Sequence, residues 1–157
     1  MSNMLRKGFC ILFLVLFFTV GKAQKTLIFT DSYKSYKYAQ ELYDKQKYSS
    51  AQAYFKEIIN EIENTQDELR INAEYYFAVC ALHLYHQNVE TLLTRFVLDH
   101  PDHPKSKSVF LQLARHYYRM KKFTKSIEYF EKIDQYDLSI EDQNEYLFKL
   151  GYSKFTR

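Results

Sequence analysis

Apolar residues recur along most of this chain with the period of an α-helix. Ala51, Phe55 and Ile58 lie at positions i, i+4 and i+7, and Phe130 and Ile133 repeat that spacing further on. Such a stripe buries one face of an amphipathic helix. We therefore predict an all-α fold with helices over residues 31–45, 49–63, 66–85, 89–100, 105–120, 124–135 and 141–155.

Polar residues mark where several of these helices begin. Thr65 and Glu68 have the spacing of a capping box, and Ser139 begins a weaker version of the same motif. Asn88 is predicted as an N-cap and Pro104 as a first-turn residue, where the missing N–H costs nothing. The connections of about two to six residues are typical of antiparallel neighbours.

The first 23 residues have the three parts of a secretory signal. A basic start is followed by an uninterrupted apolar run over residues 9–20, and small residues stand at Gly21 and Ala23. This order predicts a signal peptide over residues 1–23, a short lead over 24–30 and a helical domain over 31–157. An uncleaved membrane anchor is the alternative, but the apolar run is shorter than the roughly 20 residues that a span needs.

Removing the predicted signal changes the charge of the chain. The full sequence has 22 basic and 19 acidic residues, and three of the basic ones lie within residues 1–23, which hold no acid. The remainder is formally neutral and offers no basic stripe for nucleic acid.

Cys80 is the one cysteine outside the signal, so no intrachain disulfide is expected there, and its apolar neighbours predict a buried residue.

Catalytic motifs are lacking in the sequence. Gly151 is the only glycine after the predicted signal, so neither a Gly-rich phosphate loop nor a nucleophile elbow is present. The acids are spread over helix faces with lysines nearby, which indicates a solvated surface rather than an acid–base pair. We expect no enzymatic activity and no cofactor.

Two histidine pairs suggest a metal site as a weaker alternative. His100 and His103 are three residues apart, as are His83 and His86. Zinc requires three or four ligands in fixed geometry, and neither pair has further ligands at a convincing spacing. We interpret these histidines as polar residues of turns and helix ends and predict no metal site.

A repeated pattern resembles a known family. Residues 46–58 and 121–133 share one amphipathic pattern, and small residues recur at Ala39, Ala78, Ala114 and Gly151, with spacings of 39, 36 and 37 residues. With the Leu-Gly pair that ends at Gly151, this resembles the tetratricopeptide repeat family, whose helix–turn–helix unit has about 34 residues. In the second repeat, Val89 and Leu92 both remain candidates for the small position of the second helix.

The resemblance implies a right-handed solenoid of antiparallel helix pairs with about three and a half repeats. It also implies a non-catalytic scaffold or adaptor in the periplasm or cell envelope that binds protein or peptide partners on its concave face. An alternative is the N-terminal docking module of a longer exported enzyme or envelope assembly factor. The face that the family uses for binding, rich in residues typical of binding hot spots, carries Tyr36, Gln40, Tyr43, Leu111, Arg115, Tyr118 and Arg119.

The predicted last helix is apolar on several sides. Leu147 and Gly151 occupy positions that in the family are covered by a following helix, while Phe148 and Phe155 lie on a neighbouring face. An uncovered apolar surface of this kind is unusual for a soluble monomer. We expect either a longer repeat protein or self-association through this helix.

Overall fold

Seven α-helices follow one another in this computed structural model, which describes residues 31–157. The first covers residues 31–44, and the others are α2 (Tyr48–Glu61), α3 (Glu68–His83), α4 (Val89–Asp99), α5 (Pro104–Arg119), α6 (Phe123–Phe130) and α7 (Ile140–Thr156), with a 3₁₀ turn η1 (Gln135–Asp137) before α7. The all-α prediction is confirmed. The predicted signal peptide and the lead lie outside the described residues.

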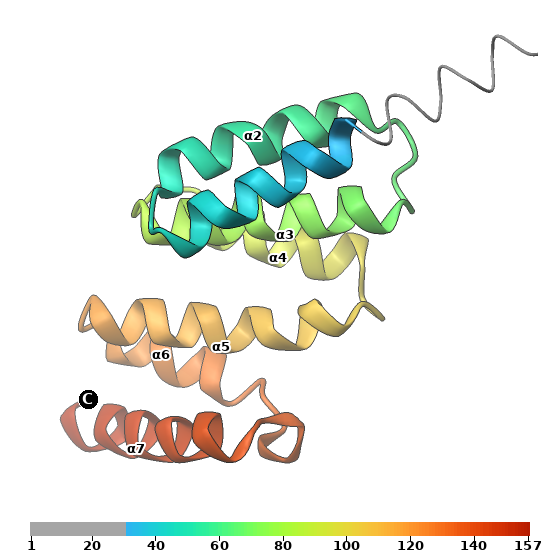
Figure 1. The fold of residues 1–157 in the computed structure, drawn as a ribbon. Helices are drawn as coiled ribbons and strands as arrows, with labels where there is room; N and C mark the ends of the chain where they lie inside the picture. Colours follow the sequence, from blue (N-terminus) through green and yellow to red (C-terminus); the bar gives the residue numbers. More distant parts are fainter. Residues whose placement is uncertain (1–30) are drawn as a thin grey trace, which may run out of the picture.

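The helices pack in chain order as antiparallel pairs (Figure 1). Each of α2 to α6 contacts the helix that follows it, so the pairs stack one on the next, with α7 at the far end. The turns within pairs lie at one edge of the stack together with the C-terminus, and the links between pairs lie at the opposite edge. None of the described helices is both long enough and apolar enough to span a bilayer.

The same turn geometry recurs within three successive pairs. Gln46, Tyr85 and Lys121 all adopt a left-handed conformation, with φ of 58°, 57° and 57°. In each turn this residue donates its N–H to the carbonyl three positions back, and the next residue donates to the carbonyl five positions back, which is a Schellman motif. Each of the three lies seven residues after Ala39, Ala78 or Ala114, so the structure shares the repeat of the sequence.

The small residues of the repeat let neighbouring helices approach closely. Ala39, Ala78 and Ala114 are all buried. On α6, the Ser126 hydroxyl donates a hydrogen bond of 3.0 Å to the Ala114 carbonyl oxygen on α5. Without a larger side chain at Ala114, the backbone of α5 remains accessible to its partner helix.

The register of the second repeat is set by its buried residues. Ala51, Phe55 and Ile58 of α2 are completely buried, and Val89, Leu93 and Phe96 of α4 are buried at the same i, i+4, i+7 spacing. Leu92 is only partly buried. Of the two candidates in the sequence, Val89 therefore corresponds to Ala51.

Helix α3 joins two hydrophobic clusters and is buried on several sides. Its Cys80 packs with the first helix and α2, whereas Val79 and Leu82 pack with α4 to α7. The prediction that Cys80 is buried is confirmed, and burial raises the pKa of its thiol to about 12.

Two predicted helix boundaries are wrong. Helix α3 is capped by Asp67 rather than Thr65, because the Asp67 carboxylate accepts hydrogen bonds from the N–H groups of Leu69 (2.9 Å) and Arg70 (3.4 Å). The sixth helix ends at Phe130 rather than at residue 135; further on, the Asp134 carboxylate accepts from the Tyr136 N–H and starts η1.

Of three other predicted helix starts, two are confirmed and the third is confirmed in position only. The Ser139 hydroxyl accepts from the Asp142 N–H at the start of α7, as expected for an N-cap. Pro104 lies in the first turn of α5, also as expected. Asn88 occupies the N-cap position of α4, but its side chain makes no capping hydrogen bond.

Candidate functional site

Two of the predicted binding residues belong to the core. Tyr36 is buried edge-on against Phe55 and Tyr76, at ring-centroid distances of 5.8 and 6.4 Å. Leu111 is buried in the larger cluster. Both side chains are therefore largely covered by neighbouring helices, and partner binding by either stays a prediction.

Gln40 and Tyr43 contribute to internal polar contacts. Gln40 Nε2 donates to Tyr36 Oη at 3.1 Å, and Tyr43 Oη lies 3.5 Å from Nε2 of His83. Tyr43 also meets Tyr48 edge-on at 5.5 Å, and Tyr48 stacks on His83 at 4.1 Å. These rings form a half-buried cluster at the turn edge of the first pair, where burial raises the pKa of Tyr43.

Arg115 connects α5 to α7 through ion pairs. Its guanidinium donates to the carboxylates of Asp142, at 2.6 Å, and of Glu145. Hydrogen bonding from Arg115, assisted by Lys149, lowers the pKa of Glu145 to about 2. Nε and Nη2 of Arg115 are thus engaged within the chain, where they hold α5 against the last helix.

Tyr118 and Arg119 lie at the turn edge of the third pair. Tyr118 meets Phe123 edge-on at 5.9 Å and 68°, nearly the geometry that Tyr43 and Tyr48 have in the first pair (5.5 Å and 71°). Arg119 is exposed. Burial, with a smaller contribution from the Arg119 charge, lowers the pKa of His83. The seven predicted residues are therefore distributed among the core, two turn clusters and one ion-pair cluster.

A groove that the sequence analysis missed lies between α3 and α4, next to the end of α2. It has a volume of about 530 Å³. Its apolar lining comes from Phe77 and Ala78 on α3 and from Leu92 and Phe96 on α4. The groove therefore offers hydrophobic surface that is open to solvent, mainly between the two helices of the second pair.

Charged side chains border this groove on both sides. On the α3 side, Arg70 Nε lies 2.9 Å from Glu74, whose other carboxylate oxygen lies 2.8 Å from the buried His100 Nε2. Arg70 Nη1 also donates to the Ile59 carbonyl oxygen at 2.6 Å, near the end of α2. On the α4 side, Arg95 pairs with an Asp99 carboxylate at 3.3 Å. The apolar base of the groove is thus bordered by positively and negatively charged side chains.

Sequence spacing contains a signal for this groove. Arg70 and Glu74 lie four residues apart on one helix, as do Arg95 and Asp99 on the next. Each pair lies beside an aromatic position of its own helix, at Phe77 or Phe96. The spacing alone predicts a dispersed solvated surface, because nothing in it indicates that α3 and α4 bring the two pairs to one cavity.

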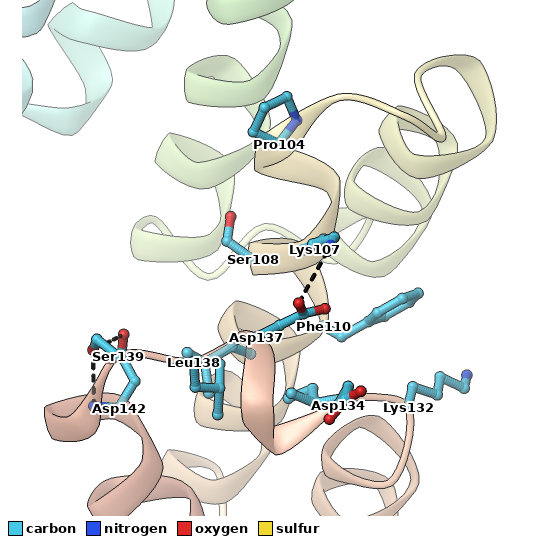
Figure 2. Close-up of a pocket in the computed structure, with 12 residues that line it drawn as sticks. Pro104, Lys107, Ser108, Phe110, Lys132, Asp134, Asp137, Leu138, Ser139 and Asp142 are labelled. Atoms are coloured by element: carbon cyan, nitrogen blue, oxygen red, sulfur yellow. Dashed lines mark hydrogen bonds and ion pairs between the residues drawn. The ribbon is translucent and has the colours of Figure 1, made fainter.

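A smaller pocket of about 290 Å³ lies between α5, η1 and the start of α7 (Figure 2). Buried Leu111 is among its lining residues. Lys107 reaches across it to Asp137 at 3.0 Å. The other lining carboxylates also have partners. Asp142 accepts hydrogen bonds from Ser139 and Arg115, and Asp134 accepts one from the Tyr136 N–H at the start of η1. The lining acids are thus engaged in holding the segment between α6 and α7.

The histidine pair at the α4–α5 connection has a structural role. His103 is the N-cap of α5, because its Nδ1 accepts from the Lys105 N–H at 3.2 Å. Its Nε2 then donates to Glu68 at 3.2 Å and contributes most to lowering the pKa of that carboxyl. Within residues 31–157, no three metal-ligating side chains cluster closely enough to hold an ion.

No protein-family model matches the sequence. No curated protein and no solved structure is significantly similar to it.

Proposed function

We propose that this chain is a non-catalytic protein-interaction scaffold built as a tetratricopeptide-type array. The stacked pairs, the three matching turns and the buried Ala39, Ala78 and Ala114 support this assignment. The repeat spacing of 36 to 39 residues is slightly longer than the family unit of about 34. In that family such pairs stack into a right-handed solenoid with extended faces suited to protein partners.

The groove between α3 and α4 is the observation that carries the proposal. An apolar floor bordered by Arg70, Glu74, Arg95 and Asp99 suits a partner segment that is itself amphipathic and carries both signs of charge. Apolar contacts provide affinity in such a groove, and the charged border provides orientation and specificity. The Glu74–His100 contact keeps one wall rigid, which limits the entropy lost on binding.

The proposed location of this scaffold is the periplasm or cell envelope. It rests on the order of basic, apolar and small residues in the first 23 positions. The partner is accordingly an exported protein or an exposed segment of one. No nucleic acid is expected as a partner, because the chain after residue 23 has equal numbers of basic and acidic residues.

A pair of matched variants on α4 tests the groove. Leu92 lines it, whereas Leu98 on the same helix is exposed and does not line it. With the purified chain as bait and envelope extract as the source, we expect Leu92→Glu to lose captured partners and Leu98→Glu to retain them. Arg95→Glu changes the exposed border without touching the floor and should weaken the same capture.

Circular dichroism and urea unfolding establish that the variants remain folded. The proposal fails if Leu92→Glu and Arg95→Glu, both folded, capture the same proteins as the unmodified chain. It also fails if the unmodified chain captures no envelope protein above the level of an unrelated helical bait.

A further inference from the structure

Helix α7 presents a broad apolar surface to solvent. The exposed fractions are 57% for Leu147, 66% for Phe148, 44% for Tyr152 and 90% for Phe155. Phe148, Tyr152 and Phe155 are spaced i, i+4 and i+7, so they form one stripe along the helix. Leu147 and Gly151 form a second stripe beside it.

The corresponding surface of α5 is covered. A shift of 37 residues places Ala114 on Gly151 and Leu111 on Phe148, and both α5 residues are buried by neighbouring helices. At Gly151, by contrast, no described atom outside its immediate neighbours and the nearby backbone of α7 lies within 4 Å of where a Cβ would be. As the sequence predicted, the surface around Gly151 has no covering helix within the described residues. The surface has the shape and polarity of a helix-packing face.

We propose that α7 of a second copy of this chain covers this surface, antiparallel and related by a two-fold axis near Tyr152, at the middle of the stripe. With the axis there, Phe148 of each copy lies beside Phe155 of the other, and Tyr152 lies beside its own counterpart. Antiparallel packing also aligns the two helix dipoles favourably.

The available apolar area suits a small stable dimer. The exposed parts of Phe148, Tyr152 and Phe155 amount to roughly 400 Å² per copy, given about 200 Å² for a whole aromatic side chain. Interfaces are about 60% apolar, so this corresponds to roughly 700 Å² per copy. A typical interface buries about 800 Å² per partner.

A head-to-tail contact with the opposite end of the stack fits less well. There the first helix exposes Lys34, Lys37 and Glu41. Covering these charges with the apolar surface of α7 would remove them from water without providing partners. A two-fold contact instead matches apolar surface with apolar surface and closes after two copies.

The oligomeric state tests this inference on the purified chain. Size-exclusion chromatography with light scattering over a dilution series should show a monomer–dimer equilibrium with a micromolar dissociation constant. The double change Phe148→Glu and Phe155→Glu should raise that constant roughly 100-fold, because it places charges at the centre of the interface. Leu98→Glu, on α4, adds the same kind of charge elsewhere and should leave the dimer intact.

A monomer at every concentration in the micromolar range would overturn the inference, as would a dimer unaffected by the double Phe change. Loss of partner capture by the groove variants alone, with the dimer retained, would concern only the proposed function.

Discussion

The Glu90 carboxylate on α4 accepts a hydrogen bond of 2.5 Å from Tyr129 Oη on α6, although the two residues are 39 positions apart. Glu90 also accepts from Tyr117 Oη and from Lys125 Nζ, the latter at 2.7 Å. Tyr117 and Tyr129 stack in parallel at 5.7 Å. One carboxylate thus connects the second helix pair to both helices of the third.

Removing this carboxylate should destabilise the fold. Glu90→Ala leaves the hydroxyls of two buried tyrosines without their acceptor, and we expect a loss of about 2 kcal/mol in the free energy of unfolding. Glu90→Gln retains an acceptor oxygen and should cost less. Urea unfolding at neutral pH measures both, and equal stability of all three proteins would show that the connection contributes nothing.

Acid should weaken the same connection. Hydrogen bonds from Lys125, Tyr117 and Tyr129 lower the pKa of Glu90 to about 2, from 4.5. Because the folded pKa is the lower one, the stabilisation is complete above pH 4.5 and is lost as the pH falls towards 2. Its size is reduced by solvent screening, since 36% of the Glu90 side chain is exposed.

The urea midpoint should therefore decrease as the pH is lowered from about 5 towards 2, because in this range the unfolded carboxyl takes up a proton while the folded one stays ionised. Glu145, whose pKa Arg115 also lowers to about 2, should contribute in the same direction. In Glu90→Gln the decrease should be smaller. An identical pH dependence in the variant would assign the effect to other groups.

Substitutions in the core should reduce the free energy of unfolding far more than a substitution on the surface. Phe55→Ala removes a completely buried ring and should cost roughly 3–5 kcal/mol. Tyr36→Ala should also be strongly destabilising, because Tyr36 is packed in the same cluster. Arg119→Ala changes an exposed residue and should stay within about 0.5 kcal/mol. Thermal or urea unfolding distinguishes them, and a strongly destabilised Arg119→Ala would contradict its surface position.

The left-handed turns should accept glycine with a gain in stability. Gln46 and Lys121 have positive φ and exposed side chains, so replacing either with glycine relieves backbone strain and removes few contacts. We expect Gln46→Gly or Lys121→Gly to stabilise the fold by about 1 kcal/mol. As a control, Lys56→Gly in the middle of α2 should destabilise it by about 1 kcal/mol. A loss of stability at both turns would show that the native side chains contribute more than the strain costs.

The sequence by itself determined the helices and much of the core. Ala51, Phe55 and Ile58 recur at helical spacing, and this local pattern is sufficient because a helix makes its hydrogen bonds within a short segment. The repeat was visible for the same reason: equivalent turns at Gln46 and Lys121 require similar flanking sequences. Neither depends on which distant residues meet.

Only the tertiary structure decided which faces are covered and which remain open. Tyr36 and Arg119 both lie on faces predicted to bind partners, yet one is in the core and the other is exposed. The groove and the Glu90 connection depend on residues 26 to 39 positions apart, such as Glu74 with His100 and Glu90 with Tyr129. Such contacts are set by how the helix pairs stack, and helical periodicity specifies which side of a helix is apolar but not which neighbour covers it.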